Sequence, residues 1–287
     1  MIAELCVARQ FSASADARED NALIDPNHHL VMSASSQQRT LQTALYEPLS
    51  SEAVACKVCG MVTEIHGCVD AGRSCEISRG TYMQLSGIPI YYHRCLHCGF
   101  LFTVAFDDWT FDDFRKNIYN EGYAKADPDY ADGSRARANA AMTASFFDQL
   151  GVRRVLDYGG GDGITAAELR VKGFDAHSWD PIVDRQRDLP APGTFDLVTA
   201  FEVFEHTPTP ADTACVALSF LGPNGRLIFS TLLMNELPRQ ATDHWYIAPR
   251  NGHISLHTST SLATLFAKLR RTVRSFNTNL HVAERSS

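Results

Sequence analysis

The sequence lacks any apolar run that approaches the roughly 20 residues of a membrane-spanning helix. Its N-terminus also lacks the charged stretch and apolar core of a secretion signal. Basic residues are in the minority, with 26 Lys and Arg against 33 Asp and Glu and a net charge of −7. Because nucleic-acid-binding proteins usually carry a basic surface, this balance argues against nucleic acid as a partner, although it leaves room for a local basic patch. We therefore expect a cytoplasmic protein with no membrane contact.

The 287 residues, 45% of them hydrophobic, can form one large domain or two smaller ones. Residues 1–52 are rich in Ser, Ala, Asp, Gln and Asn and show little apolar periodicity, so we predict that they are mostly disordered. A cysteine-bearing module follows over 53–106. Residues 107–150 indicate a helical cap, and residues 151–287 alternate between strand-like and helix-like segments.

The motif Cys-x-x-Cys-Gly occurs twice in the cysteine-bearing module. Its cysteines are Cys56, Cys59, Cys95 and Cys98. Two thiolates three residues apart on a tight turn can bind one metal, and two such turns complete the tetrahedral four-cysteine site that Zn²⁺ prefers. Four protein ligands leave no open position, so we predict a structural zinc-binding lobe; redox cysteines or buried thiols are the alternatives. Three further residues could ligate a metal but lack this spacing: His66, Cys68 and Cys75.

A glycine-rich loop follows the first strand predicted in the C-terminal part. Residues 155–163 read VLDYGGGDG, in which Asp157 precedes glycines at 159, 161 and 163. Glycine permits a positive φ and lets a ligand approach the backbone closely. An acid before the first glycine suits a cationic amine better than a pyrophosphate. We therefore predict that Asp157, Gly159, Gly161 and Gly163 bind a cofactor with an amino group.

The C-terminal part is predicted to be α/β, with a doubly wound, mostly parallel sheet of the Rossmann-like kind. Strands are expected over 152–158, 174–179, 195–201 and 225–233. Helices are expected over 164–171, 210–221 and 261–269. Residues 271–276 and 279–284 are expected to form a terminal hairpin, while residues 182–194 are too short and Pro-rich for a full helix and third strand.

Polar residues follow these predicted strands where they end. Ligands of open α/β sheets bind outside the carboxyl ends of the strands. Asp180 ends the second strand, where an acid can accept hydrogen bonds from ribose hydroxyls; a turn role before Pro181 is the alternative. The remaining cofactor-binding candidates are Tyr158, Phe201 and Glu202.

The glycine loop resembles motif I of class I S-adenosylmethionine (SAM)-dependent methyltransferases, and residues 195–206 (FDLVTAFEVFEH) resemble their motif IV. A preceding Cys-x-x-Cys-Gly lobe makes the chain similar to the sugar methyltransferases of deoxysugar pathways, whose N-terminal lobe binds zinc. This resemblance implies a SAM-binding domain over 151–287 and a sugar or nucleotide sugar as acceptor.

The general base is expected in the loop after residues 195–201. An imidazole titrates near neutral pH, so His206 is the first candidate, with Glu205 orienting it or acting itself. In the deoxysugar C-methyltransferases that the chain resembles, a Glu-His pair in this loop is implicated. The same residues, from Glu202 to His206, are also similar to the metal-binding loop of ubiquinone-pathway O-methyltransferases. A simple role in capping the next helix is the alternative.

A second cluster of polar and aromatic residues spans 243–257. Its histidines His244 and His253 are rival bases, and Gly252 is expected to expose His253. The alternative is a packed loop with Trp245 and Tyr246 in the core.

Together these features predict SAM-dependent O- or C-methylation of a small-molecule or carbohydrate acceptor. Two alternatives stay open: an RNA base methyltransferase with a zinc module, and a SAM-binding protein that does not catalyse.

Overall fold

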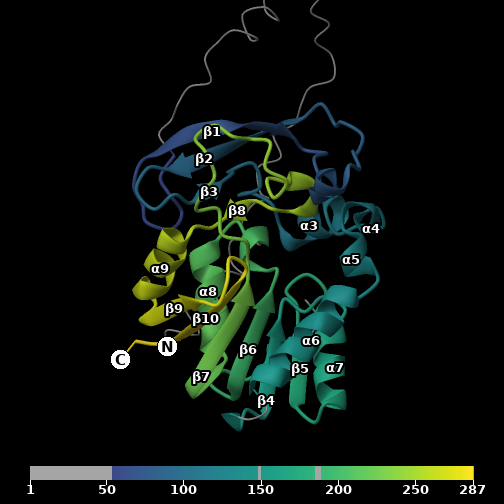
Figure 1. The fold of residues 1–287 in the computed structure, drawn as a ribbon, viewed down its shortest axis with the longest axis vertical. Coiled ribbons are helices and arrows are strands. Elements are labelled where there is room, and N and C mark those ends of the chain that lie inside the picture. Colours follow the sequence, from purple (N-terminus) through teal and green to yellow (C-terminus); the bar gives the residue numbers. More distant parts are fainter. Residues whose placement is uncertain (1–53, 148–149, 185–188, 287) are drawn as a thin grey trace, which may run out of the picture.

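The computed structural model describes residues 54–147, 150–184 and 189–286, and it contains two sheets stacked one above the other (Figure 1). The predicted disorder of residues 1–52 lies outside the described residues. An antiparallel sheet contains the cysteine-bearing module, and a larger, mostly parallel sheet contains the glycine loop. In the described part of the chain, no helix is both long and apolar enough to cross a membrane.

The larger sheet has the order β5-β4-β6-β7-β10-β9. Its strands are β4 (Arg154–Tyr158), β5 (Asp175–Trp179), β6 (Phe195–Phe201), β7 (Leu221–Ser230), β9 (Arg271–Ser275) and β10 (Leu280–Arg285). The four strands β4 to β7 are parallel, while β10 runs antiparallel to both β7 and β9. The sequence predicted this α/β sheet and its terminal hairpin correctly. In the described residues the sheet ends at β5, as expected from the short 182–194 segment.

Three helices follow the strands in the order predicted: α7 (Ile164–Val171), α8 (Pro210–Ser219) and α9 (Ser259–Lys268). A capping box between Thr258 and Ser261 starts α9 at its first turn. One boundary was wrong. The strand expected over 225–233 begins earlier, at Leu221, and ends at Ser230. This strand, β7, pairs with β6 through a shift of register between Phe195 and Leu197.

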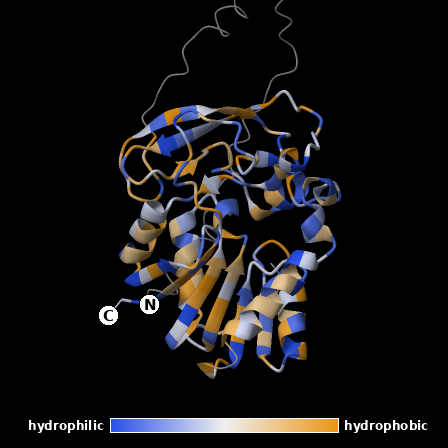
Figure 2. Cartoon of the chain, viewed as in Figure 1, coloured by the Kyte–Doolittle hydropathy of each residue, from blue (hydrophilic) through white to orange (hydrophobic). Residues whose placement is uncertain are grey.

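Successive side chains of a strand point to opposite faces of the sheet. Because both faces of this sheet are covered, alternate residues of the parallel strands pack into two separate cores. Val155 and Leu197 pack on one face with α6 (Ser134–Phe147) and α7. Leu156 and Val198 pack on the other face with α8 and α9. Figure 2 shows the resulting hydrophobic colour along the strands of this sheet.

The antiparallel sheet has the order β1-β2-β3-β8. Its strands are β1 (Thr63–Asp70), β2 (Pro89–Cys95), β3 (Leu101–Phe102) and β8 (Ser255–Leu256). The last of these comes from the long connection after β7, about 150 residues further along the chain. Phe100 and Phe102 also belong to the same core as α8 and α9. The cysteine-bearing lobe therefore packs directly on the larger sheet's helical layer.

The 107–150 segment forms short helices beside the carboxyl ends of β4 and β5 (Figure 1). They are α3 (Phe111–Asn117), α4 (Tyr123–Ala126) and α5 (Pro128–Ala131), followed by α6. A capping box between Thr110 and Asp113 starts α3. Asp127 caps α5, where its side chain accepts a hydrogen bond from Tyr130 N.

Candidate functional site

A cavity opens at the carboxyl ends of β4, β5 and β6, between these strands and helices α3 to α6. Of the predicted cofactor-binding residues, seven line it: Asp157, Tyr158, Gly159, Gly161, Asp180, Phe201 and Glu202. Gly163 does not line the cavity; it is the N-cap of α7 and has a φ of +76°. The topology therefore gathers residues from three strands at one sheet edge, where ligands of such sheets bind.

The glycines of the loop are required by steric contacts as well as by backbone angles. Gly159 has a φ of +72°, and a Cβ there would lie 2.6 Å from Val203 Cγ2. Gly160, which the spacing pattern did not single out, has an ordinary φ. A Cβ at Gly160 would nevertheless lie 2.4 Å from Ser178 Oγ and 2.5 Å from Asp157 Oδ2. The missing side chain at 160 thus keeps the Asp157 carboxylate reachable from the cavity.

Asp157 is the buried carboxylate of this cavity, with 2% of its surface exposed. Its Oδ1 accepts a hydrogen bond from Thr199 Oγ1 at 2.6 Å. Its Oδ2 is buried and has no hydrogen-bond partner among the described residues. Burial raises the pKa of Asp157 to about 6, although the Thr199 and Thr165 hydroxyls pull it down. An orphaned buried carboxylate oxygen is the group that a cationic amine would satisfy.

Asp180 closes the glycine loop from the neighbouring strand. Its Oδ2 accepts a hydrogen bond from Gly161 N at 3.1 Å, and its Oδ1 accepts from Ile182 N and Val183 N. Burial raises the pKa of Asp180, against these backbone donors. The turn role that the sequence left open is therefore present. A carboxylate has about four lone-pair sites, so room remains for hydroxyl donors from a ligand.

Glu202 follows β6 with a φ of +54°, the left-handed region that side chains other than glycine rarely adopt. Its backbone N donates to Ser230 Oγ at 2.8 Å, and Ser230 Oγ donates to Glu202 Oε1 at 2.7 Å. This two-point contact with the end of β7 holds the strained conformation. Such strain costs about 1–3 kcal/mol and is concentrated at functional sites.

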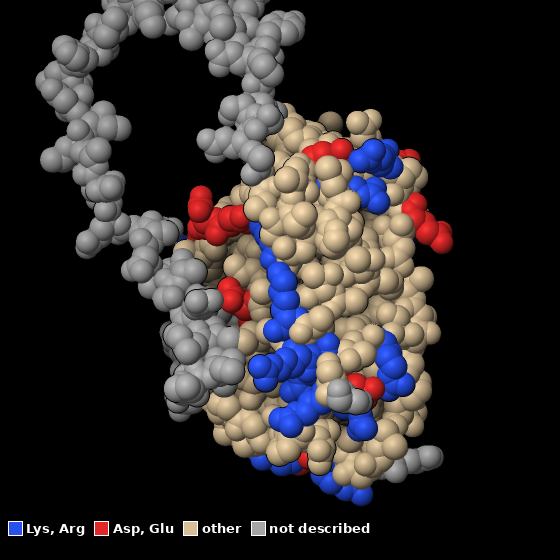
Figure 3. All heavy atoms as spheres, turned by 90° about the vertical axis from the view of Figure 1, so that its left-hand side faces the viewer, with Lys and Arg blue, Asp and Glu red and all other residues tan. Residues whose placement is uncertain are grey.

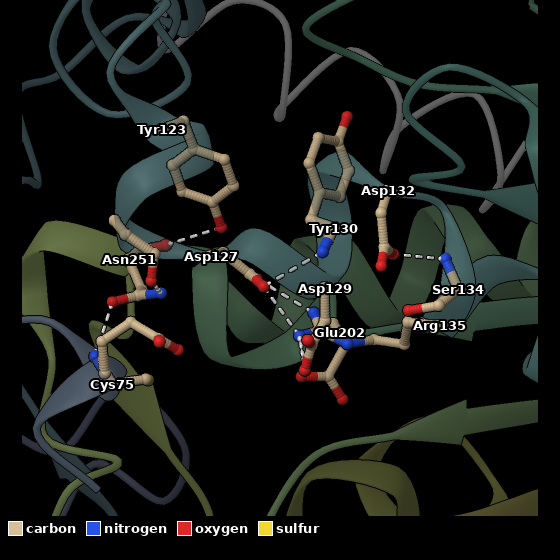
Figure 4. A network of polar contacts seen from close by, with 12 residues as sticks. Cys75, Tyr123, Asp127, Asp129, Tyr130, Asp132, Ser134, Arg135, Glu202 and Asn251 are labelled. Atoms are coloured by element: carbon tan, nitrogen blue, oxygen red, sulfur yellow. Dashed lines mark hydrogen bonds and ion pairs between the residues drawn. The ribbon is translucent and has the colours of Figure 1, made fainter. Parts of the chain in front are cut away.

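A cation that was not among the predicted site residues also lines the cavity. Arg135, at the start of α6, donates to both carboxylate oxygens of Asp127, at 3.0 and 2.8 Å (Figure 4). Burial opposes the charge on Arg135, but the contacts with Asp127 raise its pKa above that of a free arginine. Figure 4 also shows Glu202 close to this pair. Nothing in the local sequence distinguishes Arg135 from the exposed Arg137, because only the fold brings it to the cavity.

Three tyrosines form an aromatic wall on the same side. The rings of Tyr119 and Tyr123 lie 5.1 Å apart, and those of Tyr123 and Tyr130 lie 5.5 Å apart, both edge to face. All three line the cavity. Tyr119 also meets the His206 ring at 6.1 Å.

His206 is the candidate base that faces the cavity. It ends η3 (Phe204–His206), one turn after β6. Burial lowers the pKa of His206 to about 4, so the imidazole is neutral at physiological pH. Its Nδ1 is buried without a hydrogen-bond partner among the described residues.

Glu205 and His253 stand behind His206, and one polar atom of each of the three lies within 4.8 Å of the others. Glu205 is fully buried, and burial together with nearby Glu202 raises its pKa well above that of a free carboxyl. His253 is 5% exposed, and burial keeps its pKa well below the usual value. The expectation that Gly252 exposes His253 was therefore wrong: the ring packs against Tyr246 at 4.2 Å.

The other rival base lies elsewhere. His244 lines a separate surface cavity together with Trp245, and its ring stacks on Trp245 at 5.9 Å. Of the two aromatic neighbours, Tyr246 is buried in the core, whereas Trp245 is 38% exposed. Glu202 likewise stands outside the three-residue group around His206.

The four cysteines of the paired motifs come together at one end of the lobe. Their sulfur atoms lie within 4.8 Å of one another, with Cys56 Sγ 3.7 Å from Cys98 Sγ and Cys59 Sγ 3.4 Å from Cys95 Sγ. Zn–S bonds of about 2.3 Å in a tetrahedron imply sulfur separations of about 3.8 Å. The donor set and its spacing therefore fit Zn²⁺. Cys68 and Cys75, the alternative ligands, lie outside this cluster.

Comparison with known proteins matches residues 131–269 to a family described as "Methyltransferase domain". Ubiquinone biosynthesis O-methyltransferase of Photobacterium profundum is 30% identical over 107 residues, or 29% of this chain and 45% of that protein. The enzyme of the same name from Burkholderia multivorans is 32% identical over 109 residues, or 30% and 47%. The chain thus spans about half the length of these curated relatives.

Among solved structures, the Burkholderia thailandensis 1,6-didemethyltoxoflavin-N1-methyltransferase has a TM-score of 0.43 at 18% identity. The match covers 62% of this chain and 87% of that one, which contains 1,6-didemethyltoxoflavin and S-adenosylhomocysteine. The sequence matches place a class I SAM-dependent methyltransferase domain in the C-terminal part of the chain.

Proposed function

We propose that this protein transfers a methyl group from SAM to a small-molecule acceptor. The observation that carries the proposal is the orphaned Oδ2 of buried Asp157 beside Gly160. A buried carboxylate oxygen without a partner is costly, and the amino group of SAM would satisfy it with a charge-assisted hydrogen bond. Its position at the carboxyl end of β4 agrees with the methyltransferase match over residues 131–269.

Other residues of the cavity complement the rest of SAM. Arg135 supplies a cation for the carboxylate of its methionine moiety, and Asp180 supplies an acceptor for its ribose hydroxyls. The remaining cofactor candidates, Tyr158, Phe201 and Glu202, form the adjoining wall.

The protein itself has little chemistry to supply, because the methyl group of SAM is already activated by its bond to a sulfonium. The acceptor oxygen, nitrogen or carbon forms the new bond to this methyl carbon and must lose a proton. His206 is the base that we propose for this step. It is neutral and it lines the cavity. Helices α3 to α5 cover one side of the cavity.

The acceptor is proposed to be a ring compound. Tyr119, Tyr123 and Tyr130 offer ring faces and edges on which either a sugar or an aromatic ring can pack. The resemblance to deoxysugar methyltransferases favours a sugar or nucleotide sugar. The relatives act in ubiquinone biosynthesis as O-methyltransferases, so hydroxylated aromatic compounds belong in the same assay panel.

We also propose that Cys56, Cys59, Cys95 and Cys98 hold one structural Zn²⁺. Four thiolate ligands at this spacing saturate a tetrahedral ion. The ion would stabilise the lobe and take no part in the methyl transfer.

An RNA acceptor has less support. Lys and Arg side chains do gather on one face (Figure 3), which is the side of the molecule where Figure 1 labels α9, β9 and β10. Strand β9 is however the edge of the sheet opposite β5, whereas the cavity opens beside β5.

Two measurements test the proposal. Calorimetry with SAM and with S-adenosylhomocysteine should give binding of one molecule per chain. Methyl-labelled SAM and purified protein should then transfer label to a small-molecule fraction of a cell extract, separated from RNA and protein. Label in RNA would replace the proposal by the RNA alternative. Binding of SAM without transfer to any fraction would favour a non-catalytic SAM-binding protein.

A further inference from the structure

Tyr246, in the connection after β7, joins the group behind His206 and is 2% exposed. Its hydroxyl oxygen lies 2.6 Å from Glu205 Oε1 and 3.2 Å from Leu232 N. A backbone N–H can only donate, so the tyrosine oxygen accepts from Leu232. Its own hydrogen therefore points at Glu205, and the side chain has a single orientation.

The backbone of the same residue fixes a second member of the group. His253 Nδ1 lies 3.1 Å from the carbonyl oxygen of Tyr246. Because a carbonyl can only accept, Nδ1 of the neutral imidazole bears the hydrogen and Nε2 retains its lone pair. The thiol of Cys75, from the N-terminal lobe, lies 3.6 Å from the same Nδ1. Tyr246 thus contacts Glu205 through its side chain and His253 through its main chain.

We propose that Tyr246 is a positioning residue for His206, because it orients the Glu205 carboxyl and the His253 ring toward that imidazole. The inference rests on the proposed function, in which His206 is the base. Glu205 Oε1 accepts from the Tyr246 hydroxyl at 2.6 Å, and Oε2 is buried without a hydrogen bond of good geometry among the described residues, so the Tyr246 contact is the strongest constraint on the carboxyl's rotation. A phenylalanine at 246 would keep the packing and release the carboxyl.

The chain offers a matched control for this substitution. Tyr92 is fully buried in the same core, and its hydroxyl donates to the carbonyl oxygen of His253 at 2.6 Å. Tyr246→Phe and Tyr92→Phe therefore each remove one buried hydroxyl and one hydrogen bond, but only Tyr246→Phe releases Glu205. We expect Tyr246→Phe to lower kcat by about 10- to 100-fold, as misplacement of a catalytic group does. SAM affinity should stay within about 2-fold in both variants. Tyr92→Phe frees the carbonyl oxygen of His253 but leaves the Glu205 carboxyl held, so it should lower kcat less than Tyr246→Phe does.

A double-variant cycle separates positioning from general stability. If Tyr246 acts through Glu205, then Tyr246→Phe should cause no further loss of kcat in a Glu205→Gln background. Additive losses, or an equal loss of kcat in Tyr246→Phe and Tyr92→Phe, would overturn the proposal.

If the protein methylates none of the acceptors tried, that result counts against the proposed function and not against the positioning role of Tyr246. A spectroscopic measurement then tests the positioning role without any turnover. In protein labelled with ¹⁵N-histidine, His253 should show the Nδ1–H tautomer. Tyr246→Phe should shift the ring signals of His206 by more than Tyr92→Phe does. Unchanged His206 signals in Tyr246→Phe would refute the positioning role.

Discussion

Replacing Asp157 by asparagine should weaken SAM binding and yet leave the unliganded protein at least as stable. The change keeps the size of the side chain and removes its charge. Burial raises the pKa of Asp157 to about 6, so the group is ionised at pH 8 and can bind an ammonium group. A hydrogen bond to a charged group contributes about 1.5–3 kcal/mol. We therefore expect the Kd for SAM to rise by about 10- to 150-fold at pH 8, measured by calorimetry.

The effect on stability has the opposite sign. A carboxyl whose pKa is 3.8 in the unfolded chain and about 6 when folded costs the ionised folded state about 3 kcal/mol. This cost is fully present above pH 6 and fades as the pH falls from 6 to 3.8, because the folded state then binds the extra proton. Asparagine avoids this cost, but it buries an amide N–H without a partner, which lowers the free energy of unfolding by about 1–3 kcal/mol. Urea unfolding at pH 8 should therefore show unchanged stability or a gain of up to about 2 kcal/mol for Asp157→Asn.

The pH dependence of binding gives a further check. In the wild type, SAM affinity should fall about tenfold per pH unit below pH 6, as Asp157 takes up a proton that binding must displace. In Asp157→Asn this dependence should be absent. Asp175→Asn is the charge control, because Asp175 is exposed on neighbouring β5 and does not line the cavity. Equal SAM affinity in wild type and Asp157→Asn, or a clear loss of stability in the variant, would refute this account of the cavity.

Three other predictions concern separate parts of the molecule. Cys95→Ser should lose the bound zinc, measured by mass spectrometry of the purified protein, and lower the melting temperature, whereas Cys68→Ser, outside the cluster, should keep both. Arg135→Ala should raise the Kd for SAM by about tenfold, while Arg137→Ala, on the exposed side of α6, should leave it unchanged. His206→Asn should lower kcat by about 100-fold or more at unchanged SAM affinity; because burial holds the pKa of His206 near 4, wild-type kcat should show no loss from its protonation above about pH 5.

The elements that the sequence predicted well are those set by local pattern. Helix 164–171 and strand 195–201 have the bounds expected from their apolar periodicity, and Asn277 and Thr278 do turn the terminal hairpin. The glycine loop is equally local, since three of its glycines adopt the positive φ that their spacing implied. The sequence pattern did not indicate Gly160, because a side chain at this position is excluded by Ser178, which lies on the next strand.

Local patterns could not predict the contacts that site residues make with segments far away in the sequence. Arg135 becomes a cavity residue only because α6 packs beside the glycine loop. The burial of His253 has the same origin. Gly252 indicates a loop, but the loop is covered by the N-terminal lobe, where the Tyr92 hydroxyl and the Cys75 thiol reach His253. A rule that loops are exposed fails wherever a second sheet is stacked on them.

The N-terminal lobe therefore bears directly on the segment around His253, behind the proposed base His206, even though the clustered cysteines are far from that segment in the sequence. Strand β8 pairs with β3, and Thr103 N donates to the carbonyl of Ile254, next to His253. Thr258 Oγ1 donates to the carbonyl of Cys98, one of the four clustered cysteines. Loss of a metal at this cluster would loosen Cys98 and, through Thr258 and β8, the segment that holds His253. Zinc at this position would stabilise the geometry of the base while remaining outside the reaction.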